Sequence, residues 1–124
     1  MNVFISAAQP QELEDDLKRA LDTNVVGQIH LFNIFLPLIL KGKTKKIIHV
    51  TTAFADVEFT STYNIENAPL YSISKAAMNL AVSKFSAEYK KDGVLFLSVC
   101  PGSVEVGRYN TSELSHNYII FGAR

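Results

Sequence analysis

Residues 47–52, Ile-Ile-His-Val-Thr-Thr, decide the fold of this 124-residue chain. A short β-branched run that follows a basic loop, here at 41–46, is typical of a buried strand, and the two threonines then stand at its carboxyl end. A second strand is predicted at Val94 to Cys100, an apolar run that Pro101-Gly102 closes. We therefore expect two strands that each end in polar or turn-forming residues.

A long helix is predicted before each strand. Residues 11–40 carry leucine, valine and isoleucine at helical spacing, and acidic side chains gather at the positive end of the helix dipole. Pro37 lies in the last turns, where it is expected to kink or loosen the helix. Residues 70–90 predict a second helix, which stops before the glycine of Asp92-Gly93.

The order helix, strand, loop, helix, strand predicts one domain of the α/β class, because such alternation implies parallel strands joined by right-handed crossovers. Residues 53–69 are irregular and rich in turn-forming residues, so we expect a long surface loop there. Residues 107–124 are expected to form a weakly structured tail, with only a short apolar signal at 118–121.

Composition excludes several classes of partner. Twelve basic and twelve acidic residues cancel, so the charge does not favour nucleic acid. The apolar stretch at 29–40 is shorter than the roughly 20 residues of a membrane span, so no membrane partner is expected. The single cysteine, Cys100, favours a reducing, cytoplasmic location. The three histidines share no ligand spacing, so core or surface positions are favoured over a metal site.

Tyr71 and Lys75 are the strongest candidates for chemistry. They lie four residues apart on the second predicted helix, so both side chains project from the same face. Open parallel sheets bind ligands at the carboxyl ends of their strands, which here are Thr51-Thr52 and Pro101-Gly102. A cation beside a phenol lowers the pKa of the phenol, as acid–base chemistry near neutral pH requires. For this spacing taken alone, an exposed pair without function is the alternative.

Four separated segments match one family, in order and on the expected elements. They are Asp22-Thr23-Asn24-Val25-Val26-Gly27, Ile47 to Thr52, Tyr71-Ser72-Ile73-Ser74-Lys75-Ala76-Ala77, and Val99-Cys100-Pro101-Gly102. Together they resemble the short-chain dehydrogenase/reductase family over about residues 10 to 106. The resemblance implies a Rossmann-like parallel sheet with flanking helices that binds NAD or NADP. It also implies hydride transfer between nicotinamide and a small-molecule alcohol or carbonyl substrate.

The resemblance also implies roles for single residues. Tyr71 would exchange a proton with the substrate oxygen, and Lys75 would lower the pKa of Tyr71 while it hydrogen-bonds the nicotinamide ribose. Thr52 stands where the family usually has a serine that polarises the substrate carbonyl; strand capping, or Thr51 as the polar partner instead, is the alternative. Asn24 matches an asparagine that holds a water in a proton relay to the lysine. A local helix distortion satisfied by its amide is the alternative there.

Further cofactor contacts are implied after the second predicted strand. Pro101-Gly102 resembles the turn where the backbone comes close to the nicotinamide, since glycine lacks a Cβ, and Val104 would offer backbone groups to the carboxamide. Val106 stands where the family commonly has a threonine that contacts the cofactor. The spacing of 19 residues between Thr52 and Tyr71 is longer than is usual in the family. It predicts an insertion beside the substrate pocket.

The glycine-rich strand-turn-helix fingerprint of dinucleotide binding does not occur in these 124 residues. We therefore expect the C-terminal, catalytic portion of a truncated family member that lacks the N-terminal nucleotide-binding strands, with weak cofactor binding and little independent catalysis. A non-catalytic remnant that serves as a regulatory or dimerisation module, forming a homo-oligomer through the two long helices, is one alternative. An incomplete sequence of a complete enzyme is the other. The substrate and the choice between NAD and NADP stay open.

Overall fold

The computed structural model describes residues 10–102 and 119–122 of the chain. Its N-terminal helix consists of α1 (Pro10–Leu21), a π-helical turn η1 (Asp22–Val26) and α2 (Gly27–Lys41). Then follow β1 (Lys46–Val50), the 3-10 turn η2 (Ala53–Ala55), α3 (Val57–Tyr63), α4 (Pro69–Glu88), the 3-10 turn η3 (Lys90–Asp92), β2 (Leu95–Cys100) and β3 (Ile119–Gly122).

The strands form one sheet in the order β1-β2-β3. β1 and β2 pair in parallel, with Ile48 opposite Leu97, and Thr51 continues the pairing through a backbone hydrogen bond of 2.9 Å to Val99. β2 and β3 pair antiparallel, with Val99 opposite Ile120. The predicted parallel pairing of the first two strands is therefore confirmed. The described part of the chain forms a partial Rossmann-like α/β sheet with flanking helices.

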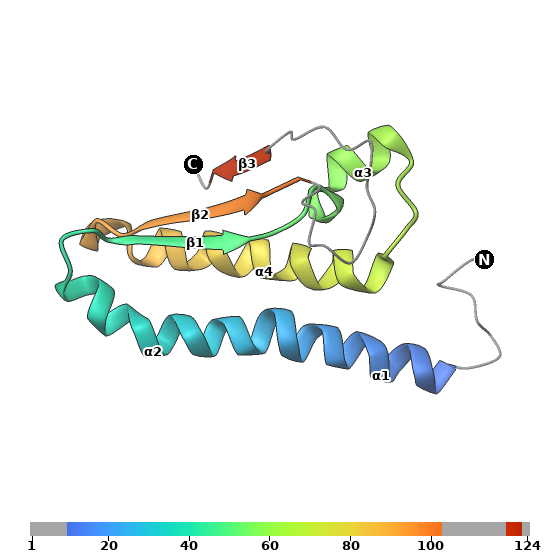
Figure 1. Ribbon diagram of the computed structural model, residues 1–124, viewed down its shortest axis with the longest axis horizontal. Coiled ribbons are helices and arrows are strands. Elements are labelled where there is room, and N and C mark those ends of the chain that lie inside the picture. The colour runs from blue at the N-terminus through green and yellow to red at the C-terminus, as the bar shows by residue number, and fades with distance from the viewer. Residues whose placement is uncertain (1–9, 103–118, 123–124) are drawn as a thin grey trace, which may run out of the picture.

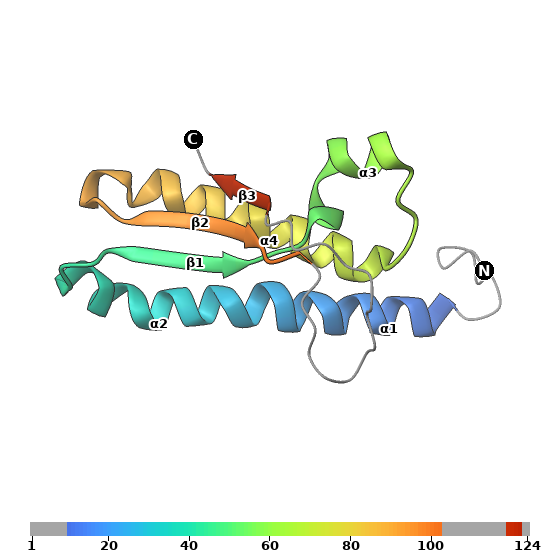
Figure 2. The same ribbon diagram turned by 45° about the horizontal axis from the view of Figure 1, so that its top comes forward.

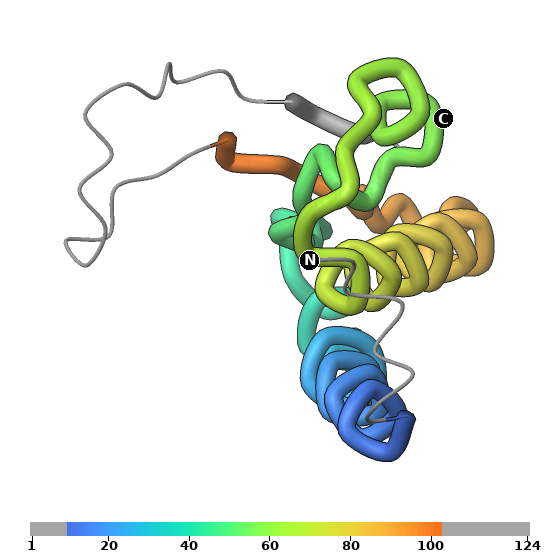
Figure 3. Tube along the Cα trace, turned by 90° about the vertical axis from the view of Figure 1, so that its right-hand side faces the viewer, coloured from blue at the N-terminus to red at the C-terminus, as the bar shows by residue number. Residues whose placement is uncertain are grey.

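Both long helices run opposite to β1 and β2 and lie side by side along the sheet (Figures 1 and 2). The end-on view shows α4 between the N-terminal helix and α3 (Figure 3). This direction is the one that a right-handed strand-helix-strand crossover requires. As a result, the carboxyl ends of β1 and β2 point toward the N-terminal half of α4 (Figure 1).

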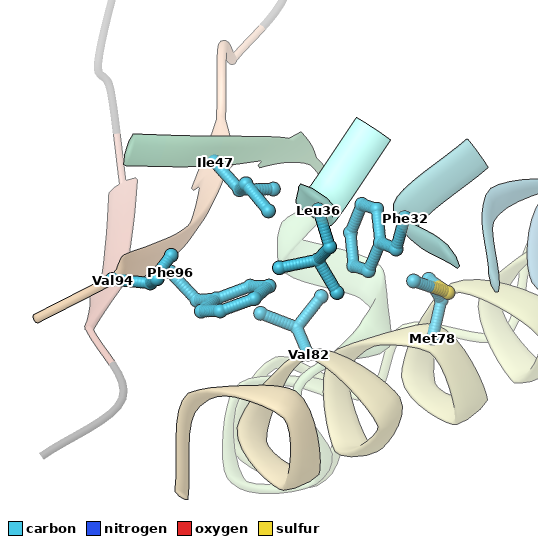
Figure 4. Packing of buried hydrophobic residues seen from close by; sticks show 7 residues of the cluster. All are labelled: Phe32, Leu36, Ile47, Met78, Val82, Val94 and Phe96. Carbon is cyan, nitrogen blue, oxygen red and sulfur yellow. The ribbon is translucent and has the colours of Figure 1, made fainter. Parts of the chain in front are cut away.

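The core lies between the two long helices and one face of the sheet. Phe96 and Met78 are completely buried at its centre, and the Phe32 ring packs edge-on against the Phe96 ring with 5.8 Å between centroids. Leu36 and Val82 complete the layer between α2 and α4 (Figure 4). Burial of side chains of this size, at roughly 1.5–3 kcal/mol each, is what holds the helices on the sheet.

The second face of the sheet is open in the described residues. Burial alternates along β1, so Ile47 and His49 face the core while Ile48 and Val50 are 62% and 56% exposed. Parallel sheets are normally covered on both faces. The apolar residues on the outer face of β1 are therefore those that a second layer of structure would cover.

The structure corrects two sequence-based expectations. Residues 53–69, predicted as a loop, contain η2 and the seven-residue helix α3, which begins where the Asp56 side chain accepts a hydrogen bond of 2.7 Å from the Phe59 amide. Part of the predicted tail is strand β3. Its short sequence has only a weak strand signal, and the backbone hydrogen bonds to β2 stabilise the strand. The remaining tail residues lie outside the described part. The predicted place of Pro37 in the last turns of the helix is confirmed, since α2 continues to Lys41.

Candidate active site

The N-terminal turn of α4 positions the candidate residues. Pro69 begins the helix, where a missing N–H costs nothing, and Ala68 precedes it with a positive φ of 50°. Tyr71 therefore lies in the first turn, and the hydrogen bond from Lys75, one turn on, to the last residue of β1 places this part of α4 beside the carboxyl end of that strand. Lys75 follows one turn later on the same face. The predicted position of the pair at this edge of the sheet is thus observed.

Lys75 joins α4 to the end of β1. Its ammonium donates a hydrogen bond of 2.9 Å to the carbonyl oxygen of Val50, the last residue of the strand. The same Nζ atom is 5.8 Å from the centre of the Tyr71 ring, within the range of a cation–π contact. Tyr71 is 44% exposed, so its ring is open to a ligand from solvent.

The protonation of this pair depends on burial. Burial, followed by the nearby Cys100, raises the pKa of Tyr71 above its usual value, and burial lowers the pKa of Lys75. In the chain by itself, desolvation of the phenolate dominates the pKa of Tyr71, and the role of Lys75 in lowering that pKa stays a prediction. Tyr71 consequently holds its proton at neutral pH.

Thr52 directly follows the end of the β1 ladder. Its Oγ1 accepts a hydrogen bond of 3.3 Å from the Phe54 amide, so the side chain caps η2. This capping role is the alternative that the sequence left open. A hydroxyl that accepts one hydrogen bond still has its own proton to donate. Thr51 is buried, and its Oγ1 has no hydrogen-bond partner in the described residues.

Asn24 lies in the π-helical turn η1, packed against α4. Its Nδ2 donates a hydrogen bond of 2.9 Å to the Ser74 hydroxyl, which donates one of 2.8 Å to the Tyr71 carbonyl oxygen. π-helical turns inside α-helices often occur at functional sites. This arrangement matches the alternative left open for Asn24, a local helix distortion whose polar groups its amide satisfies. The two hydrogen bonds also hold the turn of α4 that carries Tyr71.

The described residues fit the nicotinamide end of a dinucleotide. Lys75 and Tyr71 are accessible at the edge of the sheet, and Gly102 follows β2 with a positive φ of 71°, so no Cβ stands beside that turn. Val104 and Val106, named as cofactor positions, lie outside the described residues. No described segment offers a glycine-rich helix N-terminus for the pyrophosphate.

Sequence reasoning gave no site role to two buried polar residues beside this pair. Ser74 is fully buried, three residues after Tyr71, and the signal for it is a small polar residue on the core side of the helix. His49 is 4% exposed at the inner face of β1, and its Nε2 has no partner in the described residues. Burial, followed by the charge of Lys75, lowers the pKa of His49 to about 4. A polar interior therefore adjoins the candidate site.

Known proteins resemble this chain over most of its length. A profile of the short chain dehydrogenase family matches residues 3–116. The short chain dehydrogenase virK of Hypocrea virens is 50% identical over 90% of this chain and 41% of its own length. The short-chain dehydrogenase/reductase iacC of Pestalotiopsis fici is 48% identical over 82% of this chain and 38% of its own length. No solved structure matches.

The chain thus spans about two fifths of the length of these two curated relatives. An uncharacterized oxidoreductase of Schizosaccharomyces pombe, C663.08c, is 33% identical over 66% of this chain and 31% of its own length. The match in sequence coincides with the parallel strands and with the helix that carries Tyr71 and Lys75. On this evidence the chain belongs to the short-chain dehydrogenase family of oxidoreductases.

Proposed function

We propose that this chain carries the proton-transfer and nicotinamide-facing part of an NAD(P)-dependent oxidoreductase that interconverts a small-molecule alcohol and its carbonyl. The observation that carries the proposal is the Tyr71–Lys75 pair, accessible at the carboxyl ends of two parallel strands. Ligands of open α/β sheets bind at this edge. The family of the chain supports the reaction class.

Tyr71 is the proton donor in the direction of carbonyl reduction. A tyrosine phenol is protonated at neutral pH, so Oη can donate its proton to the substrate oxygen as negative charge develops there. Nicotinamide, when bound, supplies or accepts the hydride. Alcohol oxidation uses the reverse transfer, in which the substrate hydroxyl gives its proton to Tyr71 after the phenol itself has been deprotonated.

Two neighbours assist this transfer. Thr52 offers the remaining proton of its hydroxyl to the same substrate oxygen, while the Phe54 amide fixes the rotamer of the hydroxyl. Lys75 uses one of its three N–H donors on the Val50 carbonyl, which leaves two for a ribose and for Tyr71. Asn24 acts as a positioning residue, since its amide holds Ser74 and thereby the first turn of α4.

The 124-residue chain alone is expected to bind the cofactor weakly and to lack turnover. The proposed cofactor contacts reach only the nicotinamide end; they come from Tyr71, Lys75 and the Pro101-Gly102 turn. Pyrophosphate binding uses a glycine-rich turn at a helix N-terminus. Calorimetry should find no saturable NADH or NADPH binding at micromolar cofactor. A chimaera that adds the upstream half of a relative such as virK should gain binding and carbonyl reduction.

The two parts of this test have separate meanings. Micromolar cofactor affinity of the 124-residue chain would contradict the expected weakness, without touching the reaction class. A folded chimaera that binds cofactor and yet reduces no carbonyl from a broad panel of aldehydes and ketones would contradict the proposed reaction.

A dimerisation module is the second candidate function, and one observation favours it. The outward face of α2 carries exposed apolar side chains, among them Ile34 (65%) and Leu38 (62%). Exposed apolar patches of this kind mark association surfaces. We propose that a second copy of the chain covers this face, in a homo-oligomer that can exist with or without catalysis.

A further inference from the structure

A cavity of about 680 Å³ lies between the 54–69 segment and the first two turns of α4. Phe54, Ala55 and Ile65 line it from the segment side, and Pro69, Ile73 and Ala76 line it from the helix side. Figures 1 and 3 show α3 standing over this end of α4. The volume is within the range of about 300–1,000 Å³ that is typical of small-molecule sites.

The cavity is separate from the candidate active site. Neither Tyr71 nor Lys75 nor Thr52 is among its lining residues. On α4, successive residues are about 100° apart, so the cavity-lining Ile73 and Ala76 project more than 90° around the helix axis from the Tyr71–Lys75 face. A molecule in the cavity therefore contacts a different face of the same helix.

The lining selects a neutral, mainly apolar occupant. Among the described residues that line it, the ionisable ones are Asp56 and Glu66, both acidic, with no lysine, arginine or histidine, so an anion is disfavoured. A cation would have to leave water for a wall that is mostly apolar. The hydroxyls of Thr60 and Ser72 already donate to the carbonyl oxygens of Phe54 and Ala68, respectively. They offer a ligand acceptor oxygens only.

The backbone of the cavity wall is strained. Ala68, which lines the cavity, has φ 50° and ψ 48°, a left-handed conformation that costs an alanine about 1 kcal/mol or more. Such strain is concentrated at ligand sites and clamps, where the surrounding structure holds it. The strained residue also accepts the hydrogen bond of the Ser72 amide that starts α4.

We infer that this cavity is a binding site for a neutral, mainly apolar small molecule of drug-like size, distinct from the Tyr71–Lys75 site. The inference stands on the cavity's volume, the charge of its lining and the strained Ala68. It does not depend on the proposed proton transfer.

The test is a fluorescence titration of the full 124-residue chain with the neutral dye Nile red. We expect one saturable site per chain, and weaker binding of the anionic dye 1-anilinonaphthalene-8-sulfonate. Ala76→Leu fills the cavity and should weaken Nile red binding at least about tenfold, or ~1.4 kcal/mol. Ala77→Leu adds the same volume one residue along, outside the lining, and should bind as the unchanged chain does.

A second matched pair guards against misfolding of the first. Ile73→Asp places a charge in the wall and should abolish binding, whereas Leu80→Asp, on the exposed continuation of the same helix face, should not. Circular dichroism verifies that each variant is folded. Absence of saturable binding to the unchanged chain would overturn the inference. So would equal effects on Nile red binding within each pair. The inference would also be overturned if Phe35→Asp were the one variant that lost Nile red binding, because the dye would then bind on α2.

Discussion

At the scale of single residues, the polar interior beside the candidate site is the main departure from an ordinary core. His49 faces the same side of β1 as Ile47 and is buried, which makes its charged form costly. The nearby ammonium of Lys75 adds to that cost. His49 is therefore neutral in the folded chain at neutral pH, and its burial couples folding to pH.

The sign of this coupling follows from the two pKa values. The pKa of His49 is about 4 in the folded chain and 6.5 in the unfolded chain, so the unfolded state takes up the proton first as the pH falls. Stability is full above pH 6.5 and declines toward pH 4. His49→Gln should remove a loss on the order of 2 kcal/mol between pH 7.5 and pH 4.5.

Urea unfolding at these two pH values measures the effect. His30→Gln, at an exposed position on α2, is the matched control and should keep the acid-dependent loss of the unchanged chain. An identical loss of stability in His49→Gln and in the unchanged chain would show that His49 does not carry the coupling.

At the scale of elements, the sequence predicted what depends on local pattern. Both long helices and both parallel strands lie where apolar periodicity and β-branched runs indicated them. α3 escaped prediction because its seven residues show no apolar stripe, and it depends on the Asp56 cap and on packing. β3 escaped because its pairing with β2 is a tertiary contact. Neither the packing of α3 nor the pairing of β3 can be predicted from the local sequence pattern.

The exposed face of α2 has a consequence that can be measured. Burying Leu38 and its neighbours between two copies of the chain should drive association at micromolar concentration. Leu38→Asp should weaken self-association at least about tenfold, because it places a charge in the contact. Asn33→Asp adds the same charge at another exposed position of α2 and should leave association nearly unchanged. Sedimentation equilibrium measures the self-association constant of each variant.

A membrane is the competing explanation for this face. The helix from Pro10 to Lys41 is long and apolar enough, by length and composition, to cross a bilayer, although core helices of soluble proteins meet the same criterion. Flotation of the chain with neutral phosphatidylcholine vesicles, together with a monomeric state in their absence, would contradict the self-association that we propose.

At the scale of the whole molecule, the described sheet has one uncovered edge and one uncovered face. β1 is an edge strand of the described sheet, and its outer face is open, whereas the relatives are more than twice as long as the matched region. Spacing and strand order predicted the place of the Tyr71–Lys75 pair at the sheet edge, and the family resemblance gave the pair its expected roles. The pKa of Tyr71, the Asn24–Ser74 contact and the cavity under α3 depend on burial and on tertiary packing. Spacing does not encode them.

The central claim is that Tyr71 transfers the proton in an alcohol–carbonyl interconversion. Its most direct test is Tyr71→Phe in the chimaera that carries the upstream half of virK, with carbonyl reduction and cofactor affinity measured together. Phenylalanine keeps the ring and removes the proton, so turnover should fall by about 10²–10⁴-fold while the Kd of the cofactor stays nearly unchanged. Full turnover in the Tyr71→Phe chimaera would contradict the claim.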